Sequence, residues 1–337
     1  MPSPPSPLLV GLVGVGHLGK IHARCLAALE GPALEVVGVY DVDGEAAEAV
    51  AAEYGWPRCR SLGELLDRCD AVDVVTPTST HRTVVGAALE AGRHVFVEKP
   101  VTSTGAEARE LEALADARDL LVQVGHVERF NPAFAALDTQ DLRPVFAEAH
   151  RLAPFNPRGN DVSVVLDLMI HDLDLVLSLM PAPVESVHAN GVAVTGKTVD
   201  IANARLDFAD GATANLTASR ISLKAMRKLR LFQRDAYLGI DLLAKSTEVV
   251  RLSDHDPAHP GPLQLPIDGQ LREVVVEQPT VPPVNAIQEE LRRFAESVRA
   301  GKPAVVGLAD GRRALDVAQL ILDDIEARRA KIESARA

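Results

Sequence analysis

The sequence has few aromatic residues, few cysteines and no excess of basic charge. Only 4% of its 337 residues are aromatic and three are cysteines, Cys25, Cys59 and Cys69. An odd count without metal-ligand spacing argues against a disulfide-stapled scaffold and favours a reduced, cytoplasmic protein. Lys and Arg number 35 against 47 Asp and Glu, which gives a net charge of −12. Nucleic acid is therefore not expected as a partner, because its phosphates require a basic surface.

Long apolar runs are also absent. None approaches the roughly 18 residues that cross a bilayer, so we expect no membrane partner. Residues 1–7, MPSPPSP, lack the positive charge that begins a signal peptide, and we expect them to be a disordered leader. The composition, 47% hydrophobic and 24% charged, is that of a globular protein, and the length predicts about two domains.

Strand and helix patterns alternate over the first part of the chain. Apolar runs at 8–13, 34–40 and 94–98 are typical of buried parallel strands, and helical patterns separate them. Such alternation predicts a parallel sheet covered on both faces. We therefore expect residues 1–125 to form an α/β domain.

The pattern changes in residues 126–337, which we expect to form the second domain. A strongly apolar helix is predicted over 162–180, followed by β-rich segments from 184 to about 276. No comparable helix interrupts these segments, which favours an antiparallel or mixed sheet. The proline-rich stretch 254–269 is predicted to be a loop, and two helices close the chain.

A glycine-rich turn joins the first predicted strand to the first predicted helix. The turn and the helix start contain five candidate cofactor-binding residues: Gly14, Gly16, His17, Leu18 and Gly19. In a GxGxxG motif the first glycine permits the turn, the second admits a pyrophosphate and the third allows helix–strand packing. The N–H groups and the positive dipole end of the helix then face the phosphates.

An acidic residue follows at the end of the next strand. Asp41, 22 residues after Gly19, can accept hydrogen bonds from the adenosine ribose. Neither Val42 nor Asp43 is basic, so the spacing predicts NAD rather than NADP, unless an arginine from elsewhere reaches the site. For the motif alone, a glycine turn of another α/β protein is the alternative interpretation.

Glu98-Lys99-Pro100 ends another predicted strand. Residues just past the carboxyl ends of parallel strands line the ligand crevice, so Lys99 is expected near the nicotinamide. A solvated surface lysine is the alternative.

Polar residues also interrupt the apolar helix predicted over 162–180. Asp167, His171, Asp174 and Ser178 are spaced by four, three and four residues, which places them on one helical stripe. Asp167 could orient His171 as a general base. A hydrogen-bonded core histidine is one alternative. A metal site, which would need ligands such as His126 or His22, is another, and we predict no metal.

Together these motifs resemble the glucose–fructose oxidoreductase / inositol dehydrogenase / MocA family. The segments are GVGHLG (14–19), TPTSTH (76–81), EKP (98–100), DLMIHDLD (167–174) and GKPAVVGLADGRRAL (301–315). The resemblance implies a Rossmann domain and a C-terminal α+β domain whose large, open, mostly antiparallel sheet commonly mediates dimers or tetramers. It implies Lys99 and His171 as the catalytic pair, with Asp167 nearby. It also places four residues beside the cofactor: Thr76, Pro77, His81 and Glu98.

A narrower resemblance is to bacterial UDP-N-acetylglucosamine 3-dehydrogenases. It is carried by residues 124–132, 156–174 and 219–237. It implies NAD-dependent oxidation of the C3 hydroxyl of a UDP-sugar, for example in lipid A biosynthesis. The implied substrate-binding residues are Lys99, Arg129, Asn131, Arg158, Asp167 and His171. Further cations for the diphosphate are Arg220, Lys224, Arg227, Lys228 and Arg230, for which a solvated strand face is the alternative.

Other functions remain compatible with the motifs. A dehydrogenase of a free sugar or an inositol would use the same side chains. A nucleotide-sensing regulator would need none of Lys99, Asp167 and His171, so their presence argues for an enzyme. A reductase of another small molecule, such as a dihydrodiol, would not need the His171 stripe.

Overall fold

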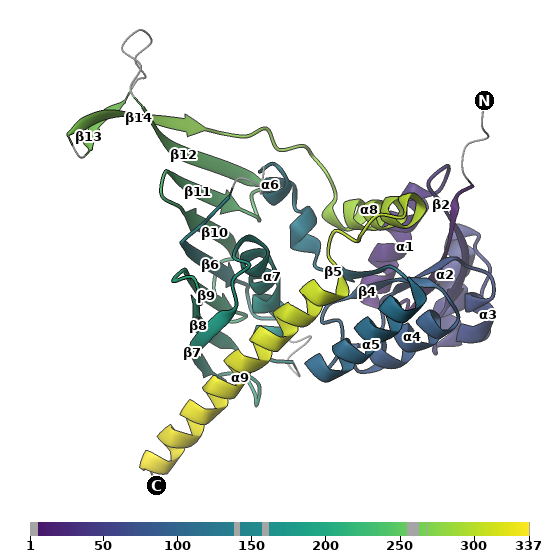
Figure 1. Ribbon diagram of the computed structural model, residues 1–337. Coiled ribbons are helices and arrows are strands. Elements are labelled where there is room, and N and C mark those ends of the chain that lie inside the picture. Colours follow the sequence, from purple (N-terminus) through teal and green to yellow (C-terminus); the bar gives the residue numbers. More distant parts are fainter. Residues whose placement is uncertain (1–5, 138–141, 157–161, 255–262, 268, 337) are drawn as a thin grey trace. The chain divides into compact units, whose positions relative to one another are not determined.

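The computed structural model describes residues 6–137, 142–156, 162–254, 263–267 and 269–336, so most of the expected leader lies outside it. The chain forms two compact units, which we describe separately (Figure 1). Unit 1 comprises Met1–Phe130 and Val284–Asp316, and unit 2 comprises Asn131–Pro283 and Val317–Ala337. This division differs from the expected one, because residues 284–316 belong to the first unit.

Unit 1 is built on the predicted parallel sheet. Its strands are β1 (Leu8–Val13), β2 (Leu34–Tyr40), β3 (Ala71–Val74), β4 (His94–Glu98) and β5 (Val122–Gly125). Neighbouring strands are parallel, in the order β2-β1-β3-β4-β5. Every residue of β3 and β5 is buried, as expected for a sheet covered on both faces.

Helices cover this sheet, and most of them begin at a capping residue. They are α1 (His17–Leu29), α2 (Gly44–Tyr54), α3 (Leu62–Leu66), α4 (Thr78–Glu90), α5 (Gly105–Arg118), the 3₁₀ turn η1 (Val127–Phe130) and α8 (Ala286–Ala300). Asp43 caps α2 and Ser61 caps α3, while Thr104 and Glu107 form a capping box at α5.

Helix α8 returns from the far end of the chain to complete the core of unit 1. Its buried Leu291 and Phe294 join the apolar cluster of β1, β2 and α1, and the Phe294 ring lies 5.9 Å from that of Phe96. The segment after α8 runs along β5, where the Val124 N–H donates to the Val306 carbonyl at 2.9 Å. Helix α9 (Leu308–Arg336) then begins in unit 1 and ends in unit 2.

Unit 2 contains a nine-stranded sheet in the order β13-β14-β12-β11-β10-β6-β9-β8-β7. Its strands are β6 (Phe146–Leu152), β7 (Val184–Val192), β8 (Ile201–Phe208), β9 (Thr213–Ser219), β10 (Met226–Phe232), β11 (Ala236–Asp241), β12 (Ser246–Asp254), β13 (Gln264–Ile267) and β14 (Gln270–Glu277). Only the β6–β9 pair is parallel, so the predicted mostly antiparallel sheet is confirmed. Strand β13 lies within the predicted loop 254–269, where it pairs with β14; residues 255–262 lie outside the described residues.

The helices of unit 2 are α6 (Pro132–Ala135), a π-helical turn η3 (Val165–Met169) and α7 (Ile170–Leu179). Eight of the ten α7 residues are buried. The single helix predicted over 162–180 is instead a π-helical turn followed by an α-helix. Such π turns are often found at functional sites.

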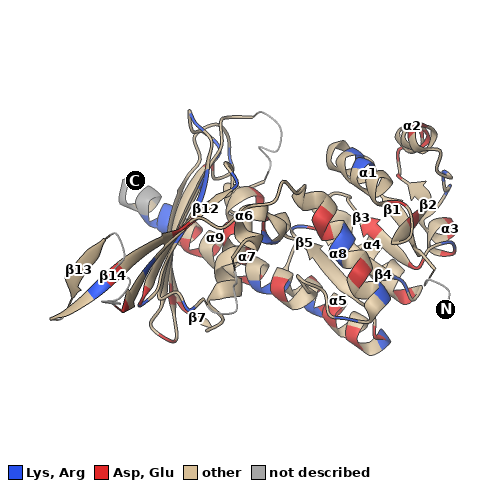
Figure 2. Cartoon of the chain, turned by 90° about the horizontal axis from the view of Figure 1, so that it is seen from above, with Lys and Arg blue, Asp and Glu red and all other residues tan. Residues whose placement is uncertain are grey.

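Charges of both signs are interspersed on the surface helices. Figure 2 shows red and blue segments along α5 and α8, and on α8 Arg292 pairs with Glu289 at 2.6 Å. Among the described residues, we find no helix that combines the length and the hydropathy needed to span a bilayer.

Candidate functional site

The glycine turn between β1 and α1 has the geometry of a dinucleotide-binding turn. Gly14 has a φ of +92°, and a Cβ there would lie 2.5 Å from the Val75 carbonyl oxygen. A Cβ on Gly19 would collide with the Gly14 carbonyl. Gly14 and Gly19 are thus required by the backbone packing of the turn, whether or not a ligand is bound.

Gly16 differs from the other two glycines because a Cβ built on it meets no atom within 4 Å. Gly16 is the N-cap of α1 and no side chain caps that helix, while His17 and Leu18 are exposed. The N–H groups at the start of α1 therefore face open space, as a bound pyrophosphate requires. These residues fit a dinucleotide.

Asp41 joins the end of β2 to the glycine turn. Its Oδ2 accepts the Val15 N–H at 2.7 Å and its Oδ1 accepts the Asp43 N–H at 2.8 Å. Each carboxylate oxygen has a second lone pair, so Asp41 can hold the turn and still accept a hydrogen bond from a ribose hydroxyl.

Arg58 is a residue near this site that sequence spacing did not predict. It borders a hollow together with Val42, Asp43 and Gly44, and it pairs with Glu48 at 3.5 Å. It lies 14 residues beyond Gly44 in sequence, so no local motif indicates it. Arg58 is the kind of cation that could tolerate a ribose 2′-phosphate.

The Asp41 carboxylate is therefore expected to set the preference for NAD. Asp41→Asn should raise KM for NAD at least about tenfold, since a charge-assisted hydrogen bond is worth about 1.5–3 kcal/mol. KM for NADP should rise less, because the repulsion of its 2′-phosphate is removed. Steady-state kinetics with both cofactors measures the ratio. Asp43→Asn, which keeps the α2 cap, is the matched control, and an unchanged ratio in Asp41→Asn would refute this role.

The Lys99 turn follows β4 and is held by buried side chains. The peptide bond between Lys99 and Pro100 is cis. The two ring nitrogens of His81, which is 1% exposed, lie 2.9 Å from the Pro100 carbonyl oxygen and 2.8 Å from that of Thr76. His81 thus links this turn to the end of β3, so any part it has in cofactor binding is indirect. Lys99 and Thr76 are half-buried, and Pro77 is exposed.

Glu98 is 8% exposed and points away from solvent. Its Oε2 accepts the Lys99 N–H at 3.1 Å, and its Oε1 lies 3.1 Å from His22 Nε2. Among the described residues, His22, Glu98 and Glu290 form the one group of metal-ligand type, with ligand atoms within 4.8 Å of one another.

In unit 2 the predicted polar stripe is only partly α-helical. Asp167 lies in the π turn, whose i→i+5 hydrogen bonds change the spacing between Asp167 and His171. Asp167 and His171 are half-buried, whereas Asp174 is 1% exposed. The Ser178 hydroxyl donates to the Leu175 carbonyl at 2.6 Å, so its role is within the helix.

A buried ion pair that the sequence did not reveal lies beside His171. Arg151 of β6 donates from Nε and one terminal nitrogen to the two oxygens of Asp172, at 2.9 and 2.8 Å. Both side chains are 3% exposed. This bidentate pair fixes α7, and hence His171, on one face of the sheet.

The other predicted substrate-binding residues have different environments. Arg129, in unit 1, lies 3.9 Å from an Asp310 oxygen. Asn131, in unit 2, accepts the Ala133 N–H and donates to the Leu242 carbonyl at 3.0 Å, so both ends of its amide have partners. Arg158 lies outside the described residues.

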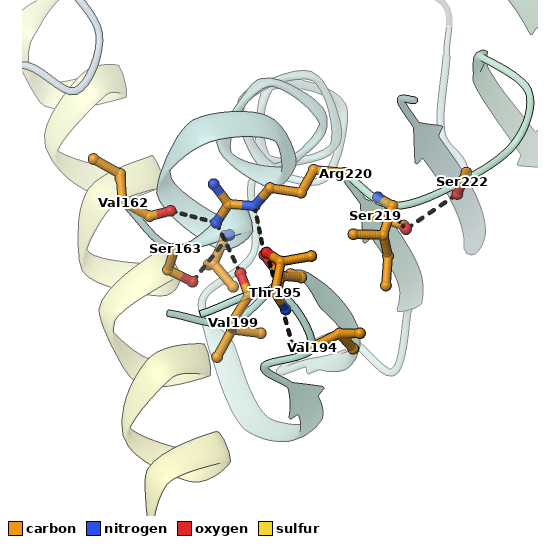
Figure 3. A network of polar contacts seen from close by, with 11 residues as sticks. Val162, Ser163, Val194, Thr195, Val199, Ser219, Arg220 and Ser222 are labelled. Carbon is orange, nitrogen blue, oxygen red and sulfur yellow. Dashed lines mark hydrogen bonds and ion pairs between the residues drawn. The ribbon is translucent and has the colours of Figure 1, made fainter. Parts of the chain in front are cut away.

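Arg220 does not belong to a phosphate site. It is 5% exposed and donates to the Val162 and Val199 carbonyls (Figure 3). It also pairs with Asp200 at 3.3 Å. Burial acts to raise the pKa of Asp200, but the Thr195 and Val194 N–H groups and Arg220 outweigh it and keep that pKa below its usual value.

Two further candidates, Lys228 and Arg230, fit the alternative interpretation of a solvated strand face. Lys228 and Arg230 alternate along β10 with the fully buried Leu229 and Leu231. They stand opposite His150 and Glu148 of β6, on the face away from Arg151 and α7. Arg227 stands opposite Arg151 and so shares the α7 face.

Comparisons with known proteins agree with this geometry. Residues 8–126 match the model of an oxidoreductase family with an NAD-binding Rossmann fold, and residues 141–234 match the GFO/IDH/MocA C-terminal domain. The match to an NAD-binding domain confirms the predicted cofactor.

Individual relatives extend this match. UDP-N-acetylglucosamine 3-dehydrogenase of Acidithiobacillus ferrooxidans is 38% identical over 94% of this chain and 97% of its own. Its crystal structure superposes with a TM-score of 0.85, at 36% identity over 95% of this chain and 98% of its own. The NAD-dependent scyllo-inositol 2-dehydrogenase of Bacillus subtilis is 31% identical over 63% of this chain and 67% of its own.

The Rossmann unit, the C-terminal sheet domain and these relatives agree with the resemblance that the motifs carry. The chain is a member of the GFO/IDH/MocA family of NAD-dependent oxidoreductases.

Proposed function

We propose that the chain oxidises the C3 hydroxyl of UDP-N-acetylglucosamine to a ketone, with NAD as the cofactor. The observation that carries this proposal is the 38% identity to an enzyme of that name over 94% of this chain. The glycine turn and Asp41 hold the cofactor. When bound, NAD supplies the hydride acceptor.

The side chains divide the remaining chemistry between them. Lys99 extends from the turn after β4, where a cation hydrogen-bonds the reacting oxygen and stabilises its developing negative charge. His171 takes the hydroxyl proton, and Asp167, in the preceding π turn, orients and stabilises the imidazolium. The Arg151–Asp172 pair supports this arrangement by anchoring α7.

Recognition of the diphosphate requires cations on the α7 side of the sheet. Arg227 is exposed and lies on that face, so it replaces Lys228 and Arg230 as our candidate. Arg129 and Arg158 remain candidates from the sequence. The net charge of −12 makes such local cations necessary, because the chain as a whole repels a dianion.

A dehydrogenase of a free inositol is the second candidate. The 31% identity to scyllo-inositol 2-dehydrogenase favours it, although that match covers 63% of this chain. The two functions differ in whether the UDP group is required.

The substrate proposal predicts NADH formation, followed at 340 nm, when UDP-N-acetylglucosamine is added to the protein and NAD. N-acetylglucosamine without UDP and scyllo-inositol should react at least about a hundredfold more slowly, because they lack the binding energy of the nucleotide. NMR of the product locates the ketone. Turnover of scyllo-inositol alone would establish the second candidate, and absence of turnover with either substrate in protein shown to bind NAD would refute both.

We also propose that the protein works in the cytoplasm as a homodimer or homotetramer. All three cysteines are free and buried, which is compatible with a reducing compartment. The face of the large sheet opposite α7 is the candidate surface for assembly.

A further inference from the structure

Four titratable side chains from four different elements meet in the core of unit 1. They are His22 of α1, Asp73 of β3, Glu98 of β4 and Glu290 of α8. Three of them are 0% exposed and Glu98 is 8% exposed. Burying ionisable groups is costly unless they are paired or neutralised, so this cluster requires an explanation that packing alone does not give.

His22 lies between two carboxylates. Its Nδ1 is 2.9 Å from Asp73 Oδ2 and its Nε2 is 3.1 Å from Glu98 Oε1. The Nδ1 contact with Asp73 is a hydrogen bond, whereas Nε2 and Glu98 Oε1 lie in close contact without hydrogen-bond geometry. Burial lowers the pKa of His22, but Asp73 and Glu98 more than offset it, and the pKa lies well above its usual value.

Glu290 places a further carboxyl group within 4.8 Å of His22 and Glu98. Both of its carboxylate oxygens are buried and have no hydrogen-bond partner among the described residues. Burial, followed by the charge of Glu98, raises the pKa of Glu290 well above its usual value. The spacing of His22, Glu98 and Glu290 also resembles a metal site, so the metal content of the protein is part of the test below.

The cluster is connected to the Lys99 turn through Glu98. One oxygen of Glu98 faces His22 and the other accepts the Lys99 N–H at 3.1 Å. Gly125 lies against this carboxylate, since a Cβ on Gly125 would be 2.8 Å from Oε1. The Glu98 side chain is therefore confined between α1 and β5, and it sets the backbone from which the Lys99 side chain departs.

We propose that His22 is a positioning residue for Lys99: its imidazole ring, held by Asp73, lies against the Glu98 carboxylate and confines it, and Glu98 fixes the Lys99 backbone. This inference rests on the proposed role of Lys99 in the reaction. His81 holds the other side of the same turn through the Pro100 carbonyl. Two buried histidines thus fix the turn from its two ends.

A double-mutant cycle tests the proposal with UDP-N-acetylglucosamine and NAD. His22→Leu should lower kcat about 10- to 100-fold and change either KM less than about threefold, because the loss arises at the reacting oxygen. In a Lys99→Ala background the same change should have almost no further effect on kcat, since a residue that acts through Lys99 has nothing left to position. If the double variant instead shows the product of the two single-variant losses in kcat, the proposal is overturned.

Two variants separate positioning from packing. His22→Gln keeps a polar side chain that can donate an N–H to Asp73 or Glu98, and it should recover part of kcat. Cys25→Ala removes a buried side chain one turn along α1 and should leave kcat unchanged. If His22→Leu does not fold, Asp73→Asn enters the same cycle, with a smaller expected loss that again vanishes without Lys99.

A substrate-independent measurement distinguishes failure of this inference from failure of the proposed function. Acetylation of Lys99 by acetic anhydride can be followed by peptide mass spectrometry, with the exposed Lys302 as internal reference. His22→Leu should change the Lys99/Lys302 rate ratio at least about threefold, and Cys25→Ala should not change it, because reactivity follows the local environment of the amine. An unchanged Lys99/Lys302 ratio in His22→Leu would overturn the proposal. So would one equivalent of bound metal in the purified protein, if that metal is absent from Glu290→Gln.

Discussion

Lys99→Ala is expected to lower kcat for alcohol oxidation by about 10³-fold, because the oxygen that loses its proton then has no cation to stabilise its charge. NAD binding should change little, since the glycine turn and Asp41, which we propose hold the dinucleotide, make their own contacts without Lys99. Stopped-flow absorbance at 340 nm gives the rate of the chemical step, and fluorescence titration gives Kd for NADH.

Lys99→Ala has two matched controls, one that removes a different lysine and one that keeps a cation at position 99. Lys302→Ala removes an exposed lysine of the same unit and should retain full activity. Lys99→Arg keeps a cation but places a wider planar group in the turn, and it should recover only a small part of the rate. A Lys99→Ala variant with wild-type kcat would show that this residue takes no part in the chemistry.

Asp172→Asn is expected to lower the free energy of unfolding by about 3–5 kcal/mol, because it leaves the Arg151 guanidinium buried without its counter-charge. Urea denaturation followed by circular dichroism reports the loss. The single tryptophan, Trp56, lies in unit 1, so its fluorescence provides a separate signal for that unit. The circular dichroism transition should move to lower urea.

The double variant Arg151→Met/Asp172→Leu should recover most of this loss, since it removes both charges together. Arg205→Gln breaks a partly exposed pair with Asp207 in the same unit and should cost at most about 1 kcal/mol. A loss in Asp172→Asn no larger than that in Arg205→Gln would contradict the structural importance of the buried pair.

The bounds of some strands of unit 1 could be predicted from sequence. Strands 8–13, 34–40 and 94–98 have the bounds that their patterns indicate. These strands are short apolar runs, and the first of them ends at a glycine. Helix α2 likewise begins at its cap, Asp43, so local chemistry determines these bounds.

Long-range pairing could not be predicted in the same way. The apolar face of α8 indicates from sequence that this helix is buried, but not against which core. In the structure α8 packs on the core of unit 1. Likewise, the Arg151–Asp172 pair joins residues 21 positions apart, and their spacing carries no signal. The shared face of Lys228 and Arg230, in contrast, could be predicted from sequence, because side chains two residues apart on a strand point to the same side.

The discontinuity of unit 1 has a consequence for synthesis on the ribosome. Residues 1–130 emerge first, but α8, which supplies Leu291 and Phe294 to their core, emerges only after residues 131–283 have been made. At about 5–20 residues per second, that interval is on the order of ten to thirty seconds. During this time the nascent first unit exposes an apolar surface on β1, β2 and α1 that α8 will later cover, and such exposed surface is prone to aggregation.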